Sequence, residues 1–361
     1  MRAGAAALLL ISVAGTAAGC TSGSSDSGGS STAAASALNI NDAPSASTAG
    51  ANDLQKAYQD TVAAVLPSVV QITAGNELGS GIVYDDKGDI VTNAHVVGGE
   101  RSFKVTMADS SSTLDATLVG SYPTNDLAVI RLSKPPSGLK PASFADSAKV
   151  GVGELVLAMG NPLGLSSSVT QGIVSAVGRT VSEPASAGQA GATIPNMVQT
   201  SAAINPGNSG GALVDLNDRV VGINTLAAVD SQSGSTSAAP GIGFAIPAST
   251  VTDLADQLIK DGKVTNSGRA ALGITTRTVL GTGSTGLNGE GAGVVSVNSG
   301  GPAANAGLRP GDVITKIDGT AVSTSQSLSE ALASKKPGEK VTVTYDRDGA
   351  SHTAEVTLGT L

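Results

Sequence analysis

Short apolar runs separated by turn residues dominate the chain after residue 67. Runs such as SVVQIT, GSGIVY, SFKVTMAD and DLAVIRLS alternate with stretches rich in Gly, Asp, Asn and Pro. Apolar runs of this length with such punctuation are typical of all-β sandwiches and barrels. The pattern continues through ELVLAMG, SVTQGIVSAVG and GIGFAI. We therefore expect a mostly β domain over residues 53–262.

Helical periodicity interrupts this pattern at both ends of the domain. Residues 53–66 predict a short helix that stops near Pro67, because proline cannot continue a helix. The run STVTDLADQLIKDGKV predicts a second helix, with Thr250 or Thr252 as its N-cap and Gly262 at its end. A smaller domain follows, in which SQSLSEALASKK predicts an amphipathic helix from the four-residue spacing of its leucines.

The first 52 residues differ in composition from the rest. MRAGAAALLLISVAGTAAGC has one early cation, an apolar stretch too short to span a bilayer, and small residues at its end. An ordinary signal peptide over residues 1–20 explains these features. AAGC also resembles a bacterial lipobox with Ala17 in place of the usual leucine, which would make Cys20 a lipidation site. Residues 21–52, rich in Ser, Gly, Ala and Thr, predict a flexible linker.

Charge and residue counts exclude several classes of function. The chain has 361 residues, a net charge of -8 and no basic stripe, which argues against nucleic-acid binding. It has one cysteine and two histidines, so the sequence predicts no disulfide framework, no metal site and no cofactor.

A serine surrounded by small residues is the main candidate for chemistry. AAINPGNSGGALV contains Ser209, and its GNSGG matches the nucleophile elbow of α/β-hydrolases. That elbow requires a helix after the serine and a downstream histidine, here His352. ALVDLNDRVVGINT instead predicts a hairpin, and His352 lies in the second domain as a surface strand residue. We therefore do not favour this assignment.

The order His, Asp, Ser fits better. His95 in IVTNAHVV is the one histidine upstream of Ser209, and Asp126 opens the aliphatic run DLAVIRL between them. Aspartates 109, 115 and 146 lie in polar, turn-like segments. Attack by Ser209 creates an oxyanion that needs fixed N–H donors. The N–H groups of Gly207 and Ser209, with Asn208 between them, are the candidates.

TNAHVV, NDLAVI, GNPLGLSSSVTQGIVSAVGR, QTSAAINPGNSGGALVDLNDRVVGINT and GIGFAIP together resemble the HtrA (Deg) family of trypsin-like serine proteases. The resemblance covers residues 56–262. It implies a chymotrypsin-like double β-barrel and a serine endopeptidase with the triad His95, Asp126 and Ser209. It also implies an oxyanion hole from the backbone of residues 207–209.

The resemblance extends to specificity. The residue six before the nucleophile lies at the base of the S1 pocket in trypsin-like enzymes, and here it is Ala203, flanked by Ile204. Leu226 would line the same pocket. No acidic residue is nearby, so we expect cleavage after small or medium aliphatic residues such as Val or Ala. The segment GRTVSEPASAGQAGATIPNMVQT resembles the family's regulatory loop.

Residues 268–358 resemble a PDZ domain, most specifically in GPAANAGLRPGDVITKIDG. Such a domain binds C-terminal peptides by β-augmentation. ALGI matches its carboxylate-binding loop, and Leu328 and Leu332 either line the peptide pocket or belong to the core. The expected peptide-binding residues are Ala271, Leu272, Gly273, Ile274, Leu328 and Leu332.

These features predict an exported protease of protein quality control or stress response, lipid-anchored on the outer face of the bacterial cytoplasmic membrane or otherwise secreted or periplasmic. Its expected partners are unfolded or damaged polypeptides, and the family implies a homotrimer with residues 53–66 as a contact. Two alternatives remain: a tethered peptide-binding adaptor or chaperone with an inactive protease fold, and a regulatory protease with one dedicated substrate.

Overall fold

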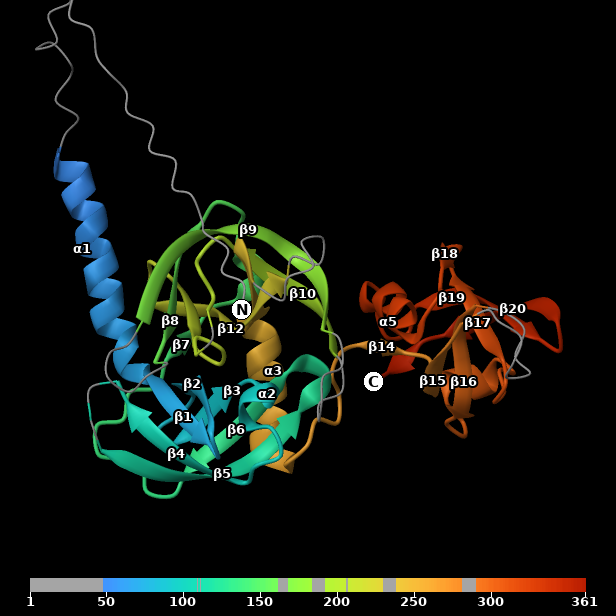
Figure 1. The fold of residues 1–361 in the computed structure, drawn as a ribbon, viewed down its shortest axis with the longest axis horizontal. Coiled ribbons are helices and arrows are strands. Elements are labelled where there is room, and N and C mark those ends of the chain that lie inside the picture. Colours follow the sequence, from blue (N-terminus) through green and yellow to red (C-terminus); the bar gives the residue numbers. More distant parts are fainter. Residues whose placement is uncertain are drawn as a thin grey trace, which may run out of the picture. The chain divides into compact units, whose positions relative to one another are not determined.

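The computed structural model describes residues 48–361 except 109, 111, 162–167, 184–191, 206, 230–237 and 281–289 (Figure 1). Cys20, the predicted signal peptide and most of the predicted linker lie outside the described residues, as do residues 184–191 of the segment predicted to be a regulatory loop. The predicted fold class is confirmed, with two β-barrels followed by a small α+β domain.

Six strands form the first barrel, closed in the order β1-β2-β3-β6-β5-β4 with every neighbour antiparallel. Exposed and buried positions alternate along β4, whereas β3 is buried throughout, as expected for a strand covered on both sides. The strands are β1 (Val69–Ala74), β2 (Glu77–Val83), β3 (Asp89–Thr92), β4 (Ser102–Met107), β5 (Thr113–Tyr122) and β6 (Leu127–Leu132).

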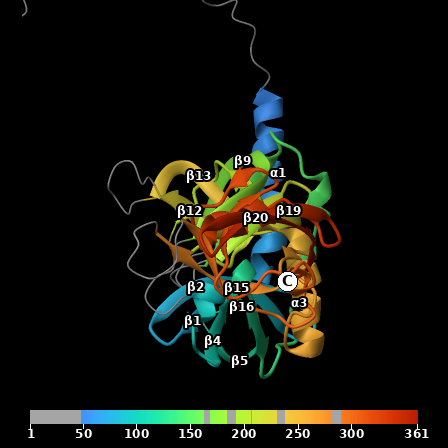
Figure 2. The same cartoon turned by 90° about the vertical axis from the view of Figure 1, so that its right-hand side faces the viewer.

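The second barrel is a sheet in the order β11-β8-β9-β10-β13-β12-β7, closed apart from β7 by pairing of β11 with β12. The β11–β12 connection is a hairpin whose turn contains Asp218 at φ 63°, which confirms the hairpin predicted after Ser209. Figures 1 and 2 show these strands, green to yellow, beside the first barrel, blue to teal. They are β7 (Ser143–Phe144), β8 (Leu155–Gly160), β9 (Ser168–Glu183), β10 (Ala192–Thr200), β11 (Ala212–Asp215), β12 (Arg219–Val229) and β13 (Ala238–Pro247).

Helices flank the barrels at both ends of the domain. Helix α1 (Thr48–Val65) runs into the 3₁₀ turn η2 (Leu66–Ser68) at the predicted proline. It begins inside the stretch 21–52 assigned to the linker, because Ala49 and Ala51 are good helix formers that extend it backward. The other short helices are α2 (Ala94–Val97), η3 (Pro123–Asn125) and η4 (Ser147–Lys149).

Helix α3 (Ala248–Asp261) ends as predicted at Gly262, which adopts the left-handed conformation and donates its N–H to the Leu258 carbonyl. The predicted threonine N-cap is wrong. Strand β13 runs directly into the helix at Pro247, and the first turn receives the Ser147 hydroxyl, which accepts from the Ser249 N–H at 3.2 Å.

The C-terminal domain has a core of its own, built around Ile314, Ile317, Val343 and Val356. Its main sheet has the order β15-β16-β17-β19-β20, which leaves β15 at an edge. Helix α5 begins with a capping box between Thr324 and Ser327. The elements are β14 (Ala270–Ala271), β15 (Ile274–Val279), β16 (Gly291–Val297), α4 (Pro302–Asn305), β17 (Val313–Ile317), β18 (Thr320–Ala321), α5 (Ser325–Ala333), β19 (Lys340–Arg347), β20 (Ala350–Thr357) and β21 (Gly359–Thr360).

Across the part of the chain that the structure describes, no helix is long and apolar enough to cross a membrane.

Candidate active site

The candidate histidine lies on a short helix. Strand β3 ends at Thr92, and His95 is the second residue of α2. Asn93, buried between them, donates its side-chain Nδ2 to the Asp126 carbonyl at 3.0 Å. Helix α2 and the start of β6 are thereby joined, so His95 is placed relative to Asp126 by the backbone of both elements.

Asp126 is buried and lies between η3 and β6 in the left-handed conformation at φ 49°. Its Oδ1 accepts from the His95 backbone N–H at 2.9 Å, and its Oδ2 lies 2.8 Å from His95 Nδ1. A carboxylate oxygen accepts hydrogen bonds, so His95 Nδ1 carries the proton in this contact. This tautomer is the one that a general base needs.

Thr225 contacts two members of the candidate triad and was not predicted from the sequence. Its hydroxyl donates to Asp126 Oδ2 at 2.6 Å, and its carbonyl accepts from the Ser209 hydroxyl at 3.0 Å. Thr225 is buried in β12. Thr225 therefore links Ser209 with Asp126. No local sequence pattern connects its strand with either residue.

Glycines are required around Ser209 because the loop packs against backbone. A Cβ on Gly210, which has φ +82°, would overlap the Ser80 carbonyl oxygen, and one on Gly211 would overlap that of Met159. Only glycine allows these approaches. The two glycines thus place the serine between strands of both barrels.

Two of the three residues predicted for the oxyanion hole present unengaged donors. Gly207 has φ +96°, and among the described residues no acceptor pairs with its N–H or with that of Ser209. The Asn208 N–H instead donates to the Asn205 carbonyl at 3.0 Å, so it is not a donor to the hole in this conformation. This hydrogen bond sets the orientation of the peptide group between Gly207 and Asn208.

The residues predicted for the substrate pocket lie in different environments. Ala203 is exposed, and its carbonyl accepts from the Thr170 hydroxyl at 2.8 Å. Ile204 is buried in the core of the second barrel beside Val174 and Val198, because its side chain fills the space above Gly243. Leu226 belongs to β12, and its side chain lies outside the described residues.

Two known domain families match parts of the chain. Residues 79–223 match the trypsin-like peptidase domain family, and residues 270–358 match the PDZ domain family. Serine protease Do-like HtrA of Lactococcus lactis subsp. lactis is 42% identical over 298 residues, covering 78% of this chain and 70% of the relative. This chain belongs to the HtrA family of serine proteases.

Other similar proteases match the chain over most of its length. Serine protease PepD of Mycobacterium tuberculosis is 41% identical over 321 residues, 83% of this chain and 66% of PepD. The serine endoprotease of Yersinia pestis has a TM-score of 0.55 and 33% identity, covering 84% of this chain and 98% of that structure. HtrA-type protease AlgW with a decapeptide has a TM-score of 0.55 and 31% identity, covering 84% and 98%.

The PDZ domain contains a cavity of about 170 Å³. Its wall includes Leu328 and Leu332 on α5; Leu328 is also part of the core, so both sequence interpretations apply to it. Gly273 has φ +71°. All six residues predicted for peptide binding line this cavity: Ala271, Leu272, Gly273, Ile274, Leu328 and Leu332.

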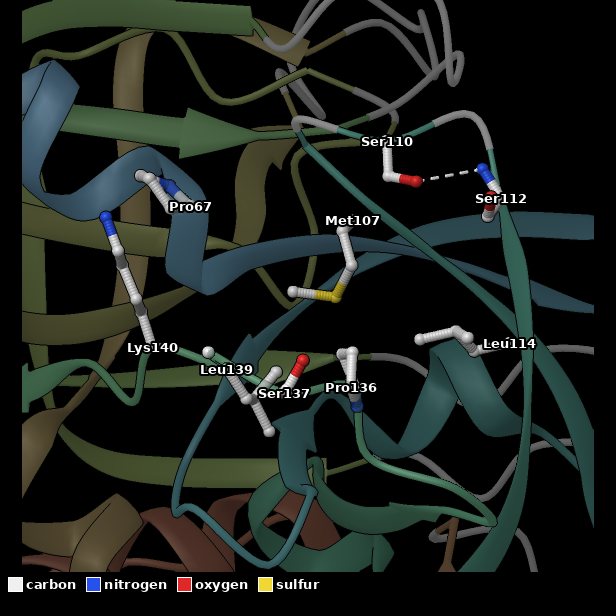
Figure 3. A pocket seen from close by; sticks show the side chains of 10 residues that line it. Pro67, Met107, Ser110, Ser112, Leu114, Pro136, Ser137, Leu139 and Lys140 are labelled. Atoms are coloured by element: carbon white, nitrogen blue, oxygen red, sulfur yellow. Dashed lines mark hydrogen bonds between the residues drawn. The ribbon is translucent and has the colours of Figure 1, made fainter.

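A second cavity, of about 320 Å³, opens beside the first barrel between Met107, Leu114 and Leu139 (Figure 3). None of the residues predicted to have a function lines it. Among the described residues, no three or more His, Cys, Asp or Glu side chains are grouped to hold a metal ion. His352 is exposed on β20, where it stacks on Tyr345.

Proposed function

We propose that this HtrA-family protein cleaves unfolded or damaged polypeptides with His95, Asp126 and Ser209 as its catalytic triad. The hydrogen-bonded chain through Thr225 is the observation that carries the proposal. It joins the Ser209 hydroxyl to Asp126, which in turn holds His95 at 2.8 Å. These contacts support the proposal because they bring a serine, an aspartate and a histidine that are distant in sequence to one site.

The proposed reaction starts when the Ser209 hydroxyl exchanges its bond to the Thr225 carbonyl for one to His95 Nε2. Ser209 Oγ then adds to the peptide carbonyl carbon while its proton passes to His95, and the N–H groups of Gly207 and Ser209 stabilise the oxyanion. Asp126 stabilises the imidazolium that forms. His95 then protonates the leaving amine, and a water molecule, deprotonated by His95, hydrolyses the acyl-enzyme.

For substrate preference, Ala203 supports cleavage after small or medium aliphatic residues. It carries no charge that would attract a Lys or Arg side chain, and it is exposed beside the nucleophile loop, where Asn208 Nδ2 lies 3.5 Å from its carbonyl. One methylene more or less on the substrate side chain changes its free energy of binding to an apolar pocket by only about 1 kcal/mol. We therefore expect a preference and not an absolute rule.

The PDZ domain is proposed to bind C-terminal peptides. The Leu272 and Gly273 carbonyls accept from the Ala303 and Asn298 N–H groups at 2.9 Å each. In a trans peptide the N–H points away from the preceding carbonyl, so the Gly273 and Ile274 N–H groups face the opposite side. These are suitable donors for a terminal carboxylate, and the edge strand β15 can pair with the extended peptide. The solved structure of the similar protease AlgW with a decapeptide supports this assignment.

We also propose that the protein is exported and anchored through a lipid on Cys20, acts in protein quality control or stress response, and forms a homotrimer. The apolar leader ending in AAGC supports export. A relative at 40% identity over 286 residues, named a probable periplasmic serine endoprotease DegP-like from Brucella suis, supports it as well. The chain spans 52% of that relative, so its role is not transferred.

The test is digestion of a chemically unfolded protein by the full chain and by Ser209→Ala. We expect cleavage by the full chain after Val or Ala and a loss of at least about 10³-fold in Ser209→Ala. Ser137→Ala, an exposed serine at the second cavity, is the matched control and should keep full activity. Equal cleavage by Ser209→Ala would exclude the triad. Fragments that end mainly in Lys or Arg would exclude the proposed specificity.

A further inference from the structure

Ser80 on β2 is fully buried and forms hydrogen bonds to three other segments. Its hydroxyl donates to the Gly207 carbonyl at 2.6 Å and accepts from the Asn161 N–H at 2.8 Å. Its backbone N–H donates to the Ser209 carbonyl at 2.8 Å. Its own carbonyl accepts from the Thr92 hydroxyl at 2.7 Å. One residue of the first barrel therefore holds the nucleophile loop at two carbonyls.

From these contacts we infer that the Ser80 hydroxyl positions the oxyanion hole. This inference rests on the proposed roles of Gly207 and Ser209. Ser80 itself touches neither substrate nor reacting atoms, so it is a positioning residue for the hole.

The bond to Gly207 fixes the peptide plane between the two donors of the hole. That plane carries the Gly207 carbonyl at one end and the Asn208 N–H at the other. The Ser80 hydroxyl holds the carbonyl, and the Asn205 carbonyl accepts from the N–H at 3.0 Å. Glycine permits a wide range of backbone angles, so the plane turns easily when one end is released. Such a turn changes the direction of the Gly207 N–H relative to the Ser209 N–H.

The segments around the peptide plane between Gly207 and Asn208 are closely packed. A Cβ on Gly160 would lie 2.8 Å from the Asn208 Cα and 3.1 Å from Ser80 Oγ, so the three segments are in direct contact. Asn161 is also buried. Without the Ser80 hydroxyl, both the Gly207 carbonyl and the Asn161 N–H lose their partner in this space.

Ser80→Ala separates the hydroxyl from the rest of the contact. The smaller side chain fits, and the backbone bonds to Ser209 and from Thr92 are retained. We expect kcat for a peptide substrate to fall about 10- to 100-fold, less than or equal to the effect of deleting a direct oxyanion donor. We expect KM to stay within about twofold, because ground-state binding does not use the hole.

A second readout distinguishes positioning from a general loss of structure. A peptidyl boronic acid forms a tetrahedral adduct with the serine and places an oxygen in the hole. Its affinity for Ser80→Ala should weaken by the same factor as kcat. Ser68→Ala, which changes a buried serine of η2 just before the first barrel, is the control and should leave both values within about twofold. Rates are taken per folded molecule, measured by circular dichroism.

If Ser80→Ala folds poorly, Ser80→Cys takes its place, because a cysteine is closer in volume to serine and its thiol is a weaker donor. The changes in kcat and in boronate affinity are then compared for this variant. Unchanged kcat and boronate affinity in the folded variant would overturn the inference. So would a loss of kcat that Ser68→Ala shares. Cleavage that survives Ser209→Ala would instead overturn the triad, and this inference with it.

Discussion

Thr225 serves the site through two groups on one residue. Its hydroxyl donates to Asp126 and its carbonyl accepts from Ser209. A buried carboxyl group needs hydrogen-bond partners, and Asp126 receives two besides the His95 ring: the His95 backbone N–H and the Thr225 hydroxyl. At the residue scale, the hydroxyl of Thr225 is therefore one of the contacts that hold the Asp126 carboxyl group in place.

Replacing that hydroxyl gives the first prediction at this scale. Thr225→Val keeps the shape and the carbonyl but removes the donor, so Asp126 loses one of its hydrogen bonds. A hydrogen bond to a charged group contributes about 1.5–3 kcal/mol, so we expect kcat to fall at least about tenfold with little change in KM. Steady-state kinetics on a peptide substrate measure this.

Thr61→Val is the matched control, since Thr61 is also a buried threonine but lies on α1. It should leave kcat unchanged. A Thr225→Val enzyme with full kcat would mean that the other donors hold Asp126 and His95 without help from the threonine hydroxyl.

At the element scale, Tyr84 connects the end of β2 with α3. Its hydroxyl donates to Asp256 at 2.7 Å, and its ring packs against Phe144 of β7 with centroids 5.4 Å apart. Burial raises the pKa of Tyr84 above its ordinary value, and the hydrogen bond to Asp256 and the charges of Asp256, Asp85 and Asp253 raise it further. The folded protein thus favours the protonated phenol.

This shift predicts a loss of stability at alkaline pH. An unfolded tyrosine titrates near pH 10, so its stabilising contribution is complete below about pH 10 and is lost as the pH rises toward the higher folded pKa. Tyr84→Phe should cost about 1 kcal/mol at pH 8 and flatten the decline between about pH 10 and pH 12. Urea denaturation across this pH range measures it.

Asp256→Asn is the control for the charge, because it keeps an acceptor oxygen and removes the negative charge beside the phenol. It should give a decline between those of the parent and Tyr84→Phe. Parallel declines in all three proteins would show that Tyr84 does not contribute to alkaline unfolding.

Elements were predicted well where a local pattern determines them. The hairpin after Ser209, the end of α3 at Gly262 and α5 follow from turn residues and apolar spacing. The α3 N-terminus was not predictable, because the Ser147 hydroxyl that accepts from its first turn is 102 residues away. Thr225 and Ser80 were missed for the same reason: their partners Asp126 and Gly207 are 99 and 127 residues distant.

At the scale of the whole molecule, the barrels and the PDZ domain have separate hydrophobic cores. The clusters around the two barrels end before residue 265, and the PDZ cluster begins at Ala270. Separate cores allow each domain to keep its structure when the other is changed. A substitution at the rim of the PDZ cavity can therefore test peptide capture on its own.

Leu332→Ala provides this test. Leu332 is partly buried, packs against the PDZ core and lines the 170 Å³ cavity. Truncating it removes apolar surface worth about 1–2 kcal/mol, so the Kd for a peptide ending in valine should rise about tenfold. Fluorescence anisotropy with a labelled peptide measures this. Gln326→Ala, on the same helix but away from the cavity wall, should leave the Kd unchanged.

The same peptide with an amidated C-terminus distinguishes binding of its side chain in the cavity from binding of its carboxylate by the loop. If the Gly273 and Ile274 N–H groups bind the terminal carboxylate, the amide should bind at least about tenfold more weakly to the parent chain and to Leu332→Ala alike. The two losses then add, because side chain and carboxylate engage different atoms. Equal binding of acid and amide, with Leu332→Ala still weaker, would place the peptide in the apolar cavity without its terminus on the loop.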